Sequence, residues 1–123
     1  MSSGASPSAW PTELRLNPEK NQLSVAFDNG ERVALAAEYL RVESPSAEVQ
    51  GHAAHERTIV PKKRNVKIKA LEAVGHYAVR IIFDDGHDTG LYTWAYLLEL
   101  GEEHETKWPA YLEALAAKGL KRE

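Results

Sequence analysis

The chain contains no cysteine in its 123 residues. The absence of cysteine excludes disulfide bonds, thiolate nucleophiles, cysteine-ligated zinc and iron–sulfur clusters held by the chain's own side chains. Long hydrophobic runs are also lacking, since none approaches the roughly 20 residues that a transmembrane helix needs. The first eleven residues have neither the basic start nor the apolar stretch of a secretory signal. These absences lead us to expect a cytoplasmic protein with no membrane contact.

Charge of one sign is not in large excess either. The formal net charge is −3 and the isoelectric point is about 6.0, so no general attraction to nucleic acid or to an anionic membrane is expected. Hydrophobic residues make up 43% of the chain and charged residues 27%, which is typical of a globular domain. We expect residues 1–10, which are mostly small and polar, to be a disordered tail, and residues 11–123 to form a single domain.

The clearest secondary-structure pattern lies in residues 75–100. Apolar side chains alternate along its first part and predict a strand with one apolar face: Tyr77, Val79, Ile81 and Phe83. Asp84–Gly86 supplies the residue types of a tight turn. A short strand and then a helix over Trp94–Leu100 are expected to follow, with Thr93 capping the helix and Gly101 ending it.

The first half of the chain predicts three strands and a helix. Strands are expected at Glu13–Leu16 and Leu23–Phe27, and a third around Val33. Asn29-Gly30, between the second and third strands, favours a type I′ hairpin. A short helix is expected over Ala36–Val42, with its apolar residues facing inward.

A basic stretch precedes the central strand. Six basic residues follow one another with no acidic residue among them: Arg57, Lys62, Lys63, Arg64, Lys67 and Lys69. Apolar and basic residues alternate in Arg64–Val74, which predicts a strand that pairs with Tyr77–Phe83 as an antiparallel hairpin. Lysines on such an edge strand protect it against aggregation; the alternative is contact with phosphate or an acidic partner. Because the stretch lacks the aromatic residues of a single-strand binder, nucleic acid is not an expected partner.

The last predicted element is an amphipathic helix at Lys107–Lys118. Apolar residues recur along it at helical spacing: Trp108, Tyr111, Leu112 and Leu115. Thr106 is expected to cap the helix, Pro109 to lie in its first turn, and Gly119 to end it. The whole pattern predicts an α+β fold: a mainly antiparallel β-sheet built from hairpins, with a short helix after the first three strands and two C-terminal helices.

The two halves of the chain echo one another. Residues 27–30, Phe-Asp-Asn-Gly, are followed by Tyr39-Leu40 on a predicted helix. Residues 83–86, Phe-Asp-Asp-Gly, are followed in the same way by Tyr96-Leu97. One interpretation is an internal duplication, with two strands and a helix in each half. The other is that any hairpin followed by a helix shows this pattern.

These Asp-x-Gly segments belong to a longer pattern that resembles a known family. Residues 27–30 and 39–49, with Gly75-His76-Tyr77 and residues 84–92, are similar to the N-terminal domain of gamma-butyrobetaine hydroxylase. They are more similar still to the stand-alone bacterial proteins named for that domain, and the likeness covers about residues 11–101. In the hydroxylases a separate, later domain holds iron(II) and 2-oxoglutarate, so the resemblance implies the scaffold without oxygenase activity.

The resemblance also implies where a metal would lie. Larger members of the family bind zinc through three cysteines and one histidine, at positions that correspond here to Ser44, Ser46, Val49 and His87. Only His87 keeps a metal ligand, and serine hydroxyls do not replace thiolates, so we expect no cofactor. The alternative is a rebuilt zinc or iron site in which His87 joins His52 and His55 of the long segment Ser44–Lys63.

No catalytic motif stands out in the sequence, which has no glycine-rich phosphate loop, no Ser-His-Asp ordering and no metalloprotease motif. We therefore expect a non-enzymatic module that binds an unidentified protein partner. The resemblance implies two partner types: a second copy in a homodimer, or a P-loop ATPase of iron–sulfur assembly, to which related domains are fused. The expected contact surface is the long segment together with its neighbours: His52, His55, His87, Asp88 and Tyr92.

Overall fold

The computed structural model describes residues 10–50 and 57–123, and the structural statements below concern these residues. Most of the expected N-terminal tail, together with His52 and His55, lies outside the described residues. The predictions made for those positions therefore stay predictions.

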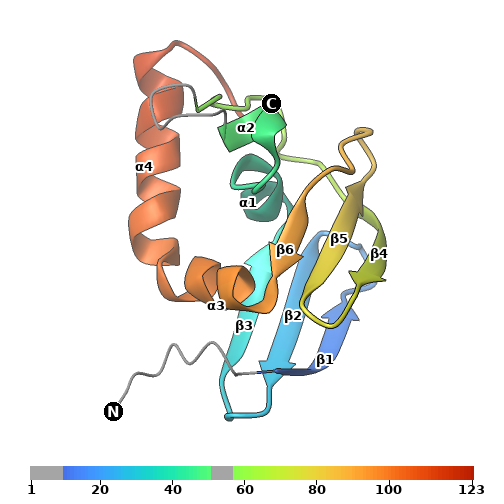
Figure 1. The fold of residues 1–123 in the computed structure, drawn as a ribbon. Helices are drawn as coiled ribbons and strands as arrows, with labels where there is room; N and C mark the ends of the chain where they lie inside the picture. The colour runs from blue at the N-terminus through green and yellow to red at the C-terminus, as the bar shows by residue number, and fades with distance from the viewer. Residues whose placement is uncertain (1–9, 51–56) are drawn as a thin grey trace.

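Six strands form two three-stranded antiparallel sheets, with strand orders β1-β2-β3 and β4-β5-β6 (Figure 1). The first sheet contains β1 (Pro11–Leu16), β2 (Gln22–Phe27) and β3 (Arg32–Ala36). The second contains β4 (Ile68–Val74), β5 (Ala78–Phe83) and β6 (Leu91–Thr93). Consecutive strands pair throughout, so each sheet is a simple meander.

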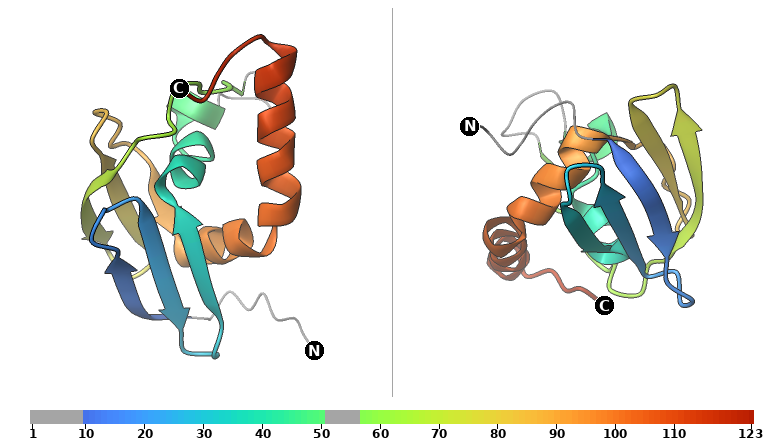
Figure 2. Two further views of the ribbon diagram at one scale, coloured as in Figure 1. Left: turned by 180° about the vertical axis from the view of Figure 1, so that it is seen from behind. Right: turned by 90° about the horizontal axis from the view of Figure 1, so that it is seen from below.

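Four helices complete the fold: α1 (Ala37–Val42), α2 (Ala47–Gln50), α3 (Trp94–Glu102) and α4 (His104–Ala117). Helices α3 and α4 lie to one side of the two sheets (Figure 2). This arrangement confirms the predicted α+β fold, with a helix after the first three strands and two C-terminal helices. None of the helices in the described ranges has the length and apolar content that crossing a bilayer requires.

The two central strands supply the core. Three large side chains of β2 and three of β5 are at most 4% exposed: Leu23, Val25, Phe27, Val79, Ile81 and Phe83. Leu40 of α1 and Leu97 of α3 are fully buried against them. Each buried side chain of this size contributes roughly 1.5–3 kcal/mol of transfer free energy. Tyr77, predicted to share this face, is instead 55% exposed, because it precedes β5 and belongs to the turn formed at Gly75.

The turns after β2 and β5 share one geometry, which is not the predicted type I′. A type I′ turn needs positive φ at both central residues, but only the glycine is positive in each turn, with φ 89° at Gly30 and 93° at Gly86. Gly30 N–H donates to the Phe27 carbonyl (3.1 Å), and Gly86 N–H donates to the Phe83 carbonyl (3.2 Å). Each turn has two residues before its glycine, Asp28-Asn29 or Asp84-Asp85, which is one more than a two-residue type I′ hairpin has.

The echo between the two halves extends to tertiary contacts. Each half consists of three strands followed by a helix, one strand more than predicted. Tyr39 is the third residue of α1, and its hydroxyl donates to the Leu100 carbonyl of α3 (2.7 Å). Tyr96 is the third residue of α3, and its hydroxyl donates to the Glu43 carbonyl at the end of α1 (2.5 Å). The two helices therefore exchange equivalent hydrogen bonds.

The N-terminal end of α3 agrees with the prediction, and its C-terminal end does not. Thr93 Oγ1 accepts the Tyr96 N–H (3.1 Å), so Thr93 caps the helix as expected. Gly101 does not end it, because α3 continues to Glu102. The glycine is instead required by packing: a Cβ placed on Gly101 would lie 2.3 Å from Val33 Cγ1 of β3.

Helix α4 begins earlier than predicted. The Glu103 carbonyl accepts the N–H groups of Thr106 and Lys107, so the first turn forms before Thr106, which is not the cap. Pro109 is therefore the sixth residue of the helix and lies beyond its first turn. Gly119 does end the helix, with φ 66° and with Leu120 N–H returning to the Leu115 carbonyl (2.9 Å).

Strand β4 pairs with β5 as predicted, but it begins at Ile68 and not at Arg64. The backbone before Ile68 is bonded to other elements. Arg64 N–H donates to the Arg122 carbonyl (3.0 Å), and Lys67 N–H donates to Asp84 Oδ1 (3.0 Å). Lys67 thus still contacts Asp84, directly after β5, and only the residues before Lys67 leave the hairpin, with Arg64 bonded to Arg122.

We expect Gly101→Ala to destabilise the fold by about 1–3 kcal/mol, because the added methyl overlaps Val33 where α3 packs on β3. Chemical denaturation of purified protein measures the change. The double variant Gly101→Ala/Val33→Ala is the control, since shortening Val33 removes the overlap and should recover part of the loss. Unchanged or higher stability of Gly101→Ala alone would contradict this packing.

Candidate functional site

The sequence-predicted ligand positions meet between α1, α2 and the β5–β6 loop. Ser44 Oγ lies 2.9 Å from His87 Nε2, although 43 residues separate them in the chain. His87 Nδ1 lies 3.0 Å from Glu48 Oε1 in α2. Ser46 Oγ lies 2.7 Å from Thr89 Oγ1 and also accepts the Glu48 N–H (3.2 Å). We call these five residues the serine–histidine cluster.

The chemistry of these donors does not fit a zinc ion. Of the four positions implied by the resemblance, Val49 has no donor atom, Ser44 and Ser46 are hydroxyls, and only His87 offers a nitrogen. Both ring nitrogens of His87 are already within hydrogen-bond distance of protein atoms. In the part of the chain that the structure describes, no three His, Asp or Glu side chains gather as metal ligands do. His52 and His55, the other candidate ligands, lie outside that part.

A second group of charges lies beside the cluster. Asp85 Oδ2 pairs with Arg41 Nε (2.7 Å) and with Lys63 Nζ (2.6 Å). Asp85 Oδ1 accepts the His87 N–H (3.0 Å). Burial by itself raises the pKa of Asp85, but its bonds to Lys63, to the His87 N–H and to Arg41 outweigh burial and lower that pKa to about 2. Arg41 Nη1 is buried with no hydrogen-bond partner among the described residues, and its positive charge opposes a cation here.

The surroundings hold His87 in its neutral form. Burial lowers the pKa of His87, Arg41 lowers it further, and Glu48 opposes both. A carboxylate only accepts, so His87 Nδ1–H donates to Glu48, and Nε2 is left to accept the Ser44 hydroxyl. The cluster is thus a directed chain of hydrogen bonds that joins α2 to the β5–β6 loop.

A carboxylate, an imidazole and a serine hydroxyl in this order also form the relay of a serine hydrolase. Here Ser44 is 0% exposed, and its Oγ also accepts the Ser46 N–H (3.2 Å). A Cβ on Gly90 would lie 2.6 Å from Ser44 Oγ, so the chain packs closely over the hydroxyl. A substrate carbonyl has no approach to Ser44 in this arrangement, and the geometry suits a structural link.

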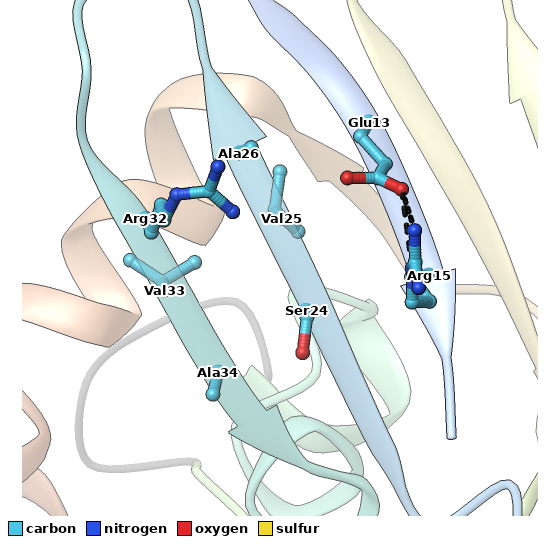
Figure 3. A pocket seen from close by; sticks show the side chains of 8 residues that line it. All are labelled: Glu13, Arg15, Ser24, Val25, Ala26, Arg32, Val33 and Ala34. Carbon is cyan, nitrogen blue, oxygen red and sulfur yellow. Dashed lines mark hydrogen bonds and ion pairs between the residues drawn. The ribbon is translucent and has the colours of Figure 1, made fainter. Parts of the chain in front are cut away.

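A hollow lies elsewhere, on the outer face of the β1-β2-β3 sheet. Its volume is about 640 Å³, and all three strands line it: Glu13, Arg15, Ser24, Val25, Ala26, Arg32, Val33 and Ala34. Figure 3 shows Glu13 paired with Arg15 on β1, and Arg32 across the small side chains of β2. The hollow is an open depression on a sheet face and contains no member of the serine–histidine cluster.

The predicted contact residues differ in their exposure to solvent. Asp88 is exposed, as a contact residue must be. His87 is only 6% exposed, and Tyr92 is fully buried with its hydroxyl donating to the Leu40 carbonyl (2.5 Å). The prediction of Tyr92 and His87 as surface contacts is therefore corrected. Burial follows from the inward side of β6 for Tyr92 and from the cover of α1 and α2 for His87.

Sequence reasoning missed Glu48, Thr89 and Arg41 as parts of the site. One signal for Glu48 was available, because Ser46-Ala47-Glu48 is a helix start with a capping serine and an acidic first turn. No local signal marks Thr89 or Arg41, whose roles depend on partners more than 40 residues away.

We expect the stability of the protein to fall as the pH is lowered below about 6.5, the ordinary pKa of histidine. Because the folded-state pKa of His87 is depressed, the unfolded chain binds a proton first, and stability is lost between 6.5 and the folded pKa. The free energy of unfolding, measured from pH 8 to pH 5, should fall less steeply in His87→Gln. An identical slope in both proteins would contradict this role of His87.

We expect tag-free wild-type protein to hold no stoichiometric zinc, and Ser44→Cys/Ser46→Cys/Val49→Cys to hold about one ion per chain, because three thiolates and His87 complete a tetrahedral donor set. Elemental analysis of both proteins measures the metal. The triple variant with His87→Ala is the control and should bind zinc more weakly. Stoichiometric zinc in the wild-type protein would show that donors outside the described residues complete a site.

Comparison with known proteins agrees with the resemblance. The family described as gamma-butyrobetaine hydroxylase-like, N-terminal, matches residues 14–98. No curated protein matches the chain. Two NMR solution structures are similar, one at 45% identity and TM-score 0.82, covering 100% of this chain and 91% of the other. The second has 40% identity and TM-score 0.80, covering 94% of this chain and 90% of the other.

A crystal structure from Acidithiobacillus ferrooxidans is also similar, at 35% identity and TM-score 0.63. The match covers 81% of this chain and 98% of that protein, which is described as a member of the DUF971 family with unknown function. These relatives are small proteins of similar length to this chain. On the family match and on these structures, the chain belongs to the gamma-butyrobetaine hydroxylase-like N-terminal domain family.

Proposed function

We propose that the protein is a non-enzymatic accessory module that acts by binding another protein. The proposal rests on one observation: the polar groups of the serine–histidine cluster bind one another inside the fold. Ser44 and His87 are buried and bonded to each other, so their chemistry is used inside the fold. Because Ser44 and His87 bind each other, we infer that a partner protein is recognised by the exposed surface around the cluster.

Two of the exposed residues at the cluster are acidic. Glu48 has a side chain 64% exposed beside the His87 ring, and Asp88 follows His87 directly at the surface. The α2 helix and the β5–β6 loop therefore present two carboxylates on the outside of a rigid hydrogen-bonded link. A partner with a basic surface complements this face, and steering by opposite charge favours its association.

A photo-crosslinking amino acid at Asp88 tests the proposal in extract from the native host. We expect one adduct of defined mass, with the same residue at exposed Glu113 of α4 as the control that gives none. Excess wild-type protein should abolish the adduct, whereas Asp88→Lys should compete poorly because it repels a basic partner. The proposal is wrong if no specific adduct forms, or if Asp88→Lys competes as well as wild type.

The mass of the adduct distinguishes the two expected partner types. An adduct of two chains of 13.7 kDa identifies a homodimer in place of a foreign partner. An adduct of any other mass identifies a different protein, which peptide sequencing then names.

A further inference from the structure

The last residues of the chain return to α1 and lie beside residues 62–64 (Figures 1 and 2). After Gly119 the backbone runs along this segment. Lys62 N–H donates to the Lys121 carbonyl (2.8 Å), and Arg64 N–H donates to the Arg122 carbonyl (3.0 Å). Two N–H groups of residues 62–64 thus bind two consecutive backbone carbonyls of the last residues. We call residues 120–123 the tail.

Arg122 anchors the tail to α1 and α4. Its Nε and Nη2 donate to the two carboxylate oxygens of Glu38, at 2.9 and 2.7 Å. The Glu38 side chain is only 8% exposed, and the guanidinium carbon lies 5.4 Å from the centre of the Trp108 ring. A planar guanidinium satisfies both contacts at once, whereas a lysine ammonium lacks the two-pronged geometry.

The groups that bind the tail are held in place by other parts of the fold. Lys62 has φ 62°, a left-handed conformation uncommon for lysine, in the residue that directs its N–H to the tail. Glu38 is in the first turn of α1 and Trp108 on α4, so both are held by helices. Apart from Arg122, the tail is exposed, and the Arg64–Glu123 pair at 3.7 Å is open to solvent.

We propose that Glu38, Trp108 and the backbone of residues 62–64 form a binding site for a peptide segment that carries an arginine, and that the chain's own tail occupies this site in cis. An arginine-bearing segment of another protein enters by displacing the tail. The tail therefore acts as a tethered competitor, present at an effective concentration on the order of millimolar. This site shares none of these residues with the acidic surface of Glu48 and Asp88, and its test is independent of the crosslinking experiment.

Amide hydrogen exchange on the full-length ¹⁵N-labelled protein tests occupancy by the tail. In Arg122→Ala we expect exchange at Lys62 and Arg64 to quicken by about tenfold or more, while amides of β2 and β5 are unchanged. Lys121→Ala is the matched control, since it leaves the backbone carbonyl and the guanidinium in place, and its exchange should equal that of wild type. Unchanged exchange in Arg122→Ala overturns the proposal.

Addition of a synthetic peptide, Gly-Leu-Lys-Arg-Glu, to Arg122→Ala tests recognition. We expect saturable NMR shifts at Lys62, Arg64 and the Trp108 indole, several-fold weaker binding when lysine replaces the peptide arginine, and none when alanine replaces it. Arg122→Ala/Glu38→Gln should bind the arginine peptide at least several-fold more weakly. Equal shifts with the arginine and alanine peptides overturn the proposal.

A second variant keeps the test decisive if Arg122→Ala does not fold. Arg122→Lys retains the positive charge next to Glu38 and loses the two-pronged contact. We expect the arginine peptide to displace its tail and produce the same shifts at Lys62 and Arg64, with a smaller effect on the wild-type chain. Absence of displacement in Arg122→Lys at millimolar peptide overturns the proposal.

Discussion

The burial of helix α1 is the constraint on which the rest of the structure depends. Five consecutive residues of this helix contact five different parts of the fold. Glu38 binds the C-terminal tail, and Tyr39 bonds to α3. The Leu40 carbonyl accepts the hydroxyl of Tyr92 in β6, and Arg41 pairs with Asp85 in the β5–β6 loop. Val42 packs against α4. A helix of six residues is unstable alone, so these contacts determine its existence as well as its position.

Most polar groups buried near α1 have partners, and Arg41 Nη1 is an exception. The hydroxyls of Ser44 and Ser46, the imidazole of His87 and the pair of Asp85 with Arg41 lie in a region with little solvent. Each such group costs free energy when its hydrogen-bonding capacity is unmet, so the network has to be nearly complete to be stable. The residues of the cluster therefore bind one another. The link between α2 and the β5–β6 loop consists of these hydrogen bonds.

Because these polar groups bind one another inside the fold, both proposed binding sites lie at the surface. Ser44 is 0% exposed and therefore out of reach of a substrate, while Glu48 and Asp88 are exposed. On another side of α1, the arginine of the tail is the only member of its segment that is not exposed. Both surfaces therefore have a rigid interior side and an accessible exterior side. That combination suits recognition of a partner, because little ordering of the protein accompanies binding.

Local residue patterns were sufficient for the strands and helices. Alternation in β2 and β5, the capping Thr93 and the terminating Gly119 act over a few residues, so each was predictable and each is confirmed. Element boundaries were less predictable wherever a distant group intervened. Arg64, predicted to begin β4, is bonded to the tail, and Gly101, predicted to end α3, is packed against Val33 within the helix.

The sequence by itself determined the α+β class, the pairing of β4 with β5 and the family, because these depend on periodicity, turn chemistry and motif. Only the tertiary structure decided which predicted site residues are accessible. Tyr92 and Asp88 lie four residues apart in one loop and strand, yet one is fully buried and the other exposed. The difference comes from α1 and α3, which cover one side of that segment, and long-range packing of this kind leaves no local signature in the chain.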